Sequence, residues 1–207
     1  MLSRGFIMLS VFFSMIVFAL VGAVSPGPVN IIAASTGAHS GYRKALSHVL
    51  GATIAYTLIV FLCGLSLERV STRLPEIMNI LRLLGGGFLL YMSFKIATAT
   101  GTGKHSQQHY TPPTFTEGAL SQALNPKAWL VAMSGISLFV LNHSPAVLYL
   151  FSFTAVSFIA CFAGVSVWAA AGNYIGHYLS TTKRQSVFNI TMGALLGGSV
   201  MSMLLGH

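Results

Sequence analysis

Long apolar runs alternate with short polar connections along most of this chain. Crossing a hydrocarbon core of roughly 30 Å takes about 20 helical residues at about 1.5 Å each. Six runs in the sequence are long enough, and together they predict an all-α integral membrane protein with six transmembrane helices. We place these spans at residues 6–24, 45–67, 77–97, 118–141, 146–170 and 187–205.

Proline interrupts the apolar pattern at two places. The sequence "SPGP" at 25–28 follows the first run, and Asn125 and Pro126 lie in the fourth. Pro126 comes 100 positions after Pro26, which is close to half of the 207-residue chain. Because proline lacks an N–H and its ring clashes with the preceding helical turn, we expect broken first and fourth helices.

The spacing of the two breaks predicts an internal repeat. Three spans per half is an odd number, so the second half enters the membrane in the opposite sense from the first. Between the halves lies a polar segment rich in Thr, Gly, Gln and Pro, which has the composition of a linker. We therefore expect one transporter domain, 1–207, made of two inverted three-helix repeats at 1–97 and 118–207 and a cytoplasmic linker at 98–117.

The broken helices are candidates for a binding site, because such breaks at matching positions of inverted halves are typical of transporters. A half-helix N-terminus presents unpaired N–H groups that suit a carboxylate. Gly27 lets a ligand approach the backbone, and Lys127 is a cation beside the second break. The candidate substrate-binding residues are Ser25, Pro26, Gly27, Pro28, Asn30, Asn125, Pro126 and Lys127.

Simpler interpretations of these residues also exist. Prolines that merely kink membrane helices are common. Lys127 can extend its ammonium group to the cytoplasmic interface instead of binding a ligand. His48, just inside the second span, is a candidate carrier of a coupling proton, although a structural hydrogen bond is the commoner role of a single histidine. The matching positions of the two breaks favour a binding site.

Composition and charge exclude several classes of function. With 54% apolar and 7% charged residues, the chain is expected in a bilayer rather than in water. Its formal charge of +8 is spread through loops, so we expect no nucleic acid partner. The chain has no Asp, and its acidic residues are Glu68, Glu76 and Glu117. No metal-binding or catalytic spacing is present, and we expect neither enzyme activity nor a metal or cofactor.

Loop charges predict the orientation, because short cytoplasmic loops carry the excess of Lys and Arg. The first, third and fifth connections carry five such residues, and the opposite side carries three. We therefore expect both termini outside the cytoplasm. The five residues are Arg43, Lys44, Lys104, Lys183 and Arg184, and the three are Arg4, Arg69 and Arg73.

Five motifs extend over nearly the whole chain: "SPGPVN" at 25–30, "GYRKALSHVLGA" at 41–52, "LLGGGFLLYMSFK" at 83–95, "NPKAW" at 125–129 and "FNITMGALLGG" at 188–198. Together they resemble the lysine exporter and homoserine/threonine efflux (LysE/RhtB) family. The resemblance implies a multi-pass exporter of amino acids in the bacterial cytoplasmic (inner) membrane, driven by the proton gradient, and makes the outer side of the membrane the periplasm. Members often carry Pro-Gln-Phe near the end of the fourth span, where this chain reads "SGISLFVLNHSP".

The charge of the candidate site bears on the cargo. A cationic side chain in a low-dielectric cavity is costly without a counter-charge, and the three Glu lie in predicted loops or at span ends. We therefore expect export of a neutral amino acid, such as threonine, homoserine or a small aliphatic one, with membrane lipid and coupling protons as the other partners. The alternatives are a metal-cation efflux protein of a related family and, with less support, an intramembrane enzyme.

Overall fold

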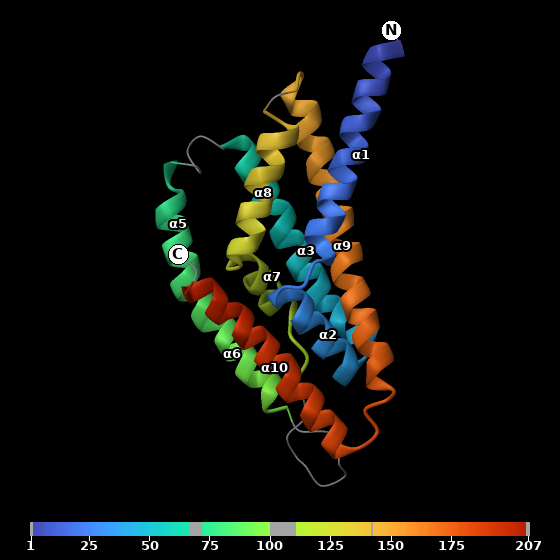
Figure 1. The fold of residues 1–207 in the computed structure, drawn as a ribbon, viewed down its shortest axis with the longest axis vertical. Coiled ribbons are helices and arrows are strands. Elements are labelled where there is room, and N and C mark those ends of the chain that lie inside the picture. Colours follow the sequence, from blue (N-terminus) through green and yellow to red (C-terminus); the bar gives the residue numbers. More distant parts are fainter. Residues whose placement is uncertain (1, 67–71, 100–110, 142, 206–207) are drawn as a thin grey trace.

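The computed structural model describes residues 2–66, 72–99, 111–141 and 143–205, and the regular structure in these ranges is entirely helical (Figure 1). Glu68, Arg69, Lys104 and part of the expected linker lie outside the described residues. The elements are α1 (Leu2–Val24), α2 (Pro28–Ser40), α3 (Tyr42–Leu65), α5 (Leu74–Ile80), the π-helix η1 (Leu81–Gly85), α6 (Gly86–Ala97), α7 (Phe115–Ala123), α8 (Pro126–Phe139), α9 (Ala146–Gly176) and α10 (Thr182–Leu205). The all-α prediction is confirmed.

Each predicted span corresponds to one helix or to helices in succession. The first, second, fifth and sixth spans correspond to α1, α3, α9 and α10, the third to α5, η1 and α6, and the fourth to α7 and α8. Within the described residues, three stretches are long and apolar enough to cross a membrane, and α1 with α2 makes a fourth if that bent pair counts as one span. The number six stays a prediction. The three stretches are Tyr42–Leu65, Leu74–Ala97 and Ala146–Gly176.

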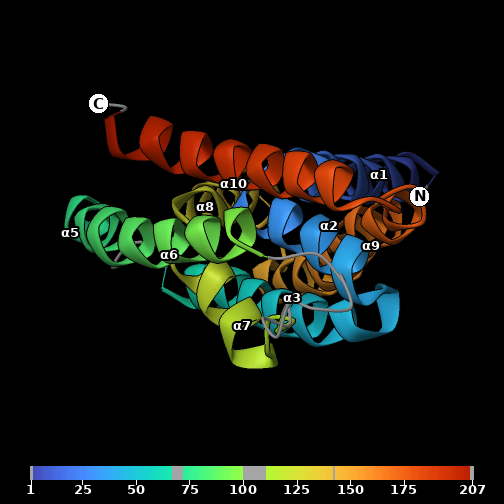
Figure 2. The same ribbon diagram turned by 90° about the horizontal axis from the view of Figure 1, so that it is seen from below.

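Helix α2 is the element that the apolar pattern did not predict. Every residue from Pro28 to Gly37 is buried, and the helix lies inside the bundle, in contact with α3, α6, α7, α9 and α10 (Figure 2). A helix surrounded by protein needs small residues for close packing rather than a lipid-facing apolar surface. The segment "AASTGAHS" at 33–40 is of this kind, so a search for long apolar runs passed over it.

Glycines allow the backbones of α2 and α9 to touch. A Cβ atom added at Gly37 would overlap the carbonyl oxygen of Ala169, and one added at Gly172 would overlap that of Ala34. The same kind of contact joins α3 to α7 at Gly51. Close approach through small residues is the usual packing between helices in membranes. These contacts fix one half-helix of each break against a long helix of the other half of the chain.

The chain crosses the bundle in alternating directions (Figure 1). In this view α1 and α2 lead downward from the N-terminus, α3 returns, α5 and α6 lead down, α7 and α8 lead up, α9 leads down and α10 leads up. The turn between α2 and α3 and the start of α10 therefore lie at the same end of the bundle. The first turns of α3 and α10, at this end, carry Arg43, Lys44, Lys183 and Arg184. The orientation of this end relative to the membrane stays a prediction.

Candidate functional site

The first break lies between α1 and α2. The two helices are bent by 61° relative to each other, and Gly27 joins them with an extended backbone, φ −174° and ψ 172°. The bend frees the last carbonyl groups of α1 from helical hydrogen bonds. Pro28 occupies the first turn of α2, where its fixed φ suits a helix start and its missing N–H is not needed. The break thus brings unpaired carbonyls and a helix N-terminus to one place.

Two side chains outside α1 bond the freed carbonyls. Asn30 donates from Nδ2 to the carbonyl oxygens of Ala23 (2.8 Å) and Ser25 (2.9 Å). Trp168 of α9 donates from Nε1 to the carbonyl oxygen of Val24 (2.9 Å). Because unpaired backbone polar groups are costly where water is excluded, these two side chains make the first break tolerable within the bundle.

The second break, between α7 and α8, finds its partners locally. Asn125 caps α8 by accepting the N–H of Lys127 at Oδ1 (3.2 Å), and it donates from Nδ2 to Oε1 of Gln122 (3.4 Å). Trp129 donates from Nε1 to the carbonyl oxygen of Ala123 (2.8 Å). All of these groups lie within residues 122–129. These bonds therefore need no residue from the first half of the chain.

Lys127 connects the two breaks. Its Nζ atom donates to Oγ of Ser25 (2.7 Å), to the carbonyl oxygen of Ser25 (3.2 Å) and to that of Pro26 (3.4 Å). No carboxylate among the described residues contacts this ammonium group. Neutral oxygen atoms alone therefore hold it, which leaves its positive charge available to an anionic group of a ligand.

A cavity of about 40 Å³, with room for a few water molecules, lies where the two breaks meet. An open groove of about 600 Å³ runs beside it between α1 and α8. Lys127 lines both and so stands at the boundary between them. Of the described residues that line the cavity, Lys127 is charged and all others are neutral. The polar residues and the cysteine in this lining are Asn30, Tyr56, Gln122, Asn125, Lys127 and Cys161.

Half of the predicted site residues line this cavity. They come from both halves of the chain and from both breaks. The structure thus brings together residues separated by about half of the sequence, with 102 positions between Lys127 and Ser25. The four cavity-lining residues from the prediction are Gly27, Asn30, Asn125 and Lys127.

The other four predicted residues surround the cavity without lining it. Ser25 lines the groove and holds the Lys127 ammonium group, and Pro26 is exposed. Pro28 and Pro126 are buried at the starts of α2 and α8. These two prolines therefore begin helices and do not face the cavity.

Sequence analysis missed Tyr56, Gln122 and Cys161, which line the cavity from α3, α7 and α9. Tyr56 and Cys161 lie within apolar runs and gave no sequence signal. Gln122 did give one, since a polar amide stands three residues before the Asn125 cap. Trp168 was also missed, because nothing local indicates that its indole N–H bonds the end of α1.

His48 attaches α3 to the first turn of α2. Its side chain is fully buried, and Nε2 lies 3.1 Å from the carbonyl oxygen of Val29. Its Nδ1 atom has no hydrogen-bond partner in the described part of the chain. His48 therefore has the structural hydrogen bond that is common for buried histidines, and its role as a proton carrier stays a hypothesis.

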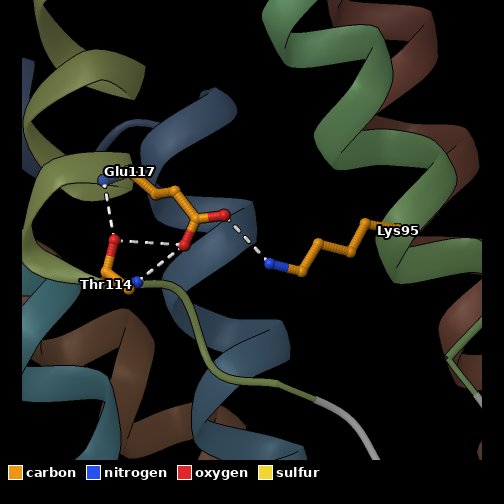
Figure 3. Close-up of polar contacts among 3 residues, drawn as sticks. All are labelled: Lys95, Thr114 and Glu117. Atoms are coloured by element: carbon orange, nitrogen blue, oxygen red, sulfur yellow. Dashed lines mark hydrogen bonds and ion pairs between the residues drawn. The ribbon is translucent and has the colours of Figure 1, made fainter. Parts of the chain in front are cut away.

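A partly buried ion pair joins the two halves beside the expected linker (Figure 3). Nζ of Lys95, near the end of α6, lies 2.9 Å from Oε1 of Glu117 in α7. Oε2 of Glu117 accepts the backbone N–H of Thr114 (2.8 Å), whose Oγ1 accepts the N–H of Glu117 (3.2 Å), so the two residues form a capping box. Burial alone would raise the pKa of Glu117, but the bonds from Thr114 and Lys95 bring it below its ordinary value.

Metal ions in proteins are usually bound by clusters of side chains. Within the described residues, no group of three or more His, Cys, Asp or Glu side chains lies close enough to hold one. Cys63 and Cys161 are both buried and free. The metal-efflux alternative therefore gains no support from this part of the chain.

This chain is similar in sequence to known transport proteins over most of its length. The family of LysE type translocators matches residues 20–205. A cysteine/O-acetylserine efflux protein of Salmonella choleraesuis (strain SC-B67) is 25% identical over 179 residues, which cover 86% of this chain and 90% of the relative. A protein of the same name from Shigella flexneri serotype 5b (strain 8401) is 27% identical over 192 residues, covering 92% and 94%. No solved structure matches this chain.

Proposed function

The chain belongs to the family of LysE type translocators, and on that basis we propose that it exports small neutral amino acids across the bacterial cytoplasmic membrane. Family membership makes it a transporter and not an enzyme. The relatives above are named for efflux of cysteine and O-acetylserine, which are small amino acids with uncharged side chains. The proposed cargo is of the same class, to which threonine and homoserine also belong.

The observation that carries the proposal is the position of Lys127 opposite the start of α2. No side chain caps the N-terminus of α2, and a Cβ atom at Gly27 would lie 3.5 Å from Nζ of Lys127. The ammonium group and the N–H groups of the first turn therefore adjoin the same small volume. A carboxylate bound there receives charge-assisted hydrogen bonds and the favourable helix dipole.

The α-ammonium group of the cargo has a matching site. When Lys127 turns to the cargo carboxylate, the carbonyl oxygens of Ser25 and Pro26 lose its hydrogen bonds. An amino-acid ammonium group replaces the lysine at these oxygens, as unwound backbone coordinates cations in other transporters. The cargo ammonium group thus takes the place of the Lys127 ammonium group at these oxygens, and Lys127 pairs with the cargo carboxylate. No charge is left unpaired in the cavity.

The neutral lining of the cavity supports a neutral cargo side chain. A lysine or arginine side chain needs a carboxylate or several strong acceptors to offset its desolvation. No acidic residue lines the cavity within the described part of the chain. Lys127 adds positive charge, which repels a second cation.

The packing of the helices supports the proposed inverted repeats. Helices α1 and α2 pack on α9, and α7 and α8 pack on α3, while α3 packs on α9 and α6 packs on α10. If α1, α2, α3 and α6 are exchanged with α7, α8, α9 and α10, each of these contacts becomes a contact that is also present. Rocking of one repeat against the other around the breaks would provide alternating access. The proposal further includes coupling to protons and periplasmic termini, as the resemblance and the loop charges predict.

Transport by the full chain in liposomes tests the proposal. Vesicles are loaded with labelled threonine, cysteine, leucine, lysine or arginine, and release is followed with and without a pH gradient. We expect faster release of the small neutral amino acids and dependence on the gradient. Release confined to lysine and arginine contradicts a neutral cargo. Movement of cadmium or nickel without any amino acid supports metal efflux instead.

A further inference from the structure

Three uncharged residues that can form hydrogen bonds belong to the part of the cavity wall that does not also line the groove. Tyr56, Gln122 and Cys161 line the cavity and do not line the groove at which Lys127 stands. They are 7%, 8% and 3% exposed and come from three different helices. This group, which we call the inner cluster, consists of a phenol, an amide and a thiol. All three are uncharged groups that make hydrogen bonds.

Hydrogen bonds place the inner cluster at the end of a chain that begins at Lys127. Asn125 accepts the backbone N–H of Lys127 and donates to Gln122 (3.4 Å), and Nε2 of Gln122 lies 4.0 Å from Sγ of Cys161. Within the cluster, the contact between Gln122 and Cys161 is long for a hydrogen bond. The cluster is therefore polar and weakly bonded internally, which leaves donors and acceptors for a ligand.

We propose that the inner cluster is the subsite for the cargo side chain and that Gln122 selects side chains ending in an uncharged hydrogen-bonding group such as a hydroxyl or thiol. This inference rests on the proposed function, because it uses the carboxylate site at Lys127 and α2 to orient the amino acid. With the carboxylate held at the groove boundary, the side chain extends toward the inner cluster. An apolar side chain there leaves buried amide and hydroxyl groups without partners, which lowers affinity.

The test compares cargo pairs that differ only in the hydrogen-bonding group: serine with alanine, cysteine with 2-aminobutyrate, and threonine with valine. Each competes for export of a labelled amino acid by the reconstituted full chain. We expect the wild-type protein to prefer the polar member of each pair by roughly five- to tenfold. Gln122→Leu reduces this preference to below about twofold, whereas Gln185→Leu, outside the cavity, leaves it unchanged.

Further variants keep the test decisive if Gln122→Leu fails to fold. Tyr56→Phe removes a single hydroxyl and Cys161→Ala a single thiol, and at least one of them is expected to lower the preference for the polar cargo. Export of amino acids with an unchanged preference in every folded variant of the cluster overturns the subsite while leaving the proposed function intact. Absence of amino-acid export by the wild-type protein defeats the proposed function itself.

Discussion

The two helix breaks occupy corresponding positions in the two halves, yet they are completed differently. At the first, Asn30 and Trp168 bond the freed carbonyls, and Lys127 of the other half binds Ser25 and Pro26. At the second, the partners of the bonds at Ala123 and at the α8 N-terminus lie within residues 122–129. The first break therefore depends on the packing of both halves, and the second is a local structure.

The helix N-termini at the two breaks also differ, because one is capped by a side chain and the other is not. Asn125 caps α8 with its own side chain, whereas Gly27 cannot cap α2. One N-terminus is already occupied, and the other lies beside the ammonium group of Lys127. The proposed inverted repeats would therefore contain a single anion site, the one proposed at the start of α2. The second half contributes the cation, and the first half contributes the free helix end.

The largest expected effect comes from Lys127→Met, which keeps the length of the side chain and removes its charge. Loss of a charge-assisted hydrogen bond to the cargo carboxylate costs about 1.5–3 kcal/mol, so KM for export should rise roughly 10- to 100-fold. Initial export rates over a range of internal cargo concentrations measure it. Lys183→Met, at an exposed position in α10, is the control. An unchanged KM would remove Lys127 from the site.

Alanine substitutions at the two asparagines compare the stability of the two breaks. Asn30→Ala leaves the Ala23 carbonyl without a partner and weakens bonding at Ser25, which costs about 1–3 kcal/mol. Asn125→Ala removes a helix cap, which costs about 1 kcal/mol. Unfolding midpoints in mild detergent should therefore fall further for Asn30→Ala. Equal or reversed shifts would show that the second break is as dependent on its asparagine as the first.

Gly27→Ala tests the uncapped end of α2. The backbone at Gly27 is extended, and the new methyl group would lie 3.5 Å from Nζ of Lys127, so we expect folding to be preserved. The methyl group separates the helix end from the ammonium group and should raise KM roughly two- to fivefold, as expected for about 0.5–1 kcal/mol. Gly87→Ala is the control, since a Cβ there has no neighbour within 4 Å. Identical KM values for both variants would argue against a carboxylate at α2.

The smallest effect is expected at Glu117, where the two halves meet away from the breaks. Glu117→Gln retains a capping residue and loses the ion pair with Lys95, so the loss in stability should stay below about 1 kcal/mol. Because the folded protein lowers the pKa of Glu117, its contribution is present above the ordinary value of 4.5 and disappears as the pH falls below it. Unfolding midpoints of both proteins at neutral and acid pH measure this. A difference that persists in acid would contradict the ion-pair explanation.

Much of the candidate site could be predicted from sequence because its signals are local. Proline at 26, 28 and 126 acts on its own helical turn, so the breaks were visible without any tertiary information. Gly27, Asn30, Asn125 and Lys127 are all close in sequence to a break. Tyr56 and Cys161 have no such local signal, since a residue in an apolar run has the same sequence neighbours whether its side chain faces lipid or a cavity.

The sequence by itself determined that the chain is helical, that it is apolar enough for a bilayer, and where its helices break. These properties depend on segment length, on apolar content and on the missing N–H of proline, all of which act over a few residues. The tertiary structure alone decided that α2 is enclosed by protein and that Lys127 reaches across 102 positions to Ser25. It also decided that Trp168 of α9 bonds the end of α1. The reason is that hydrogen-bond partners of a broken helix are chosen by packing between distant segments, which no local pattern records.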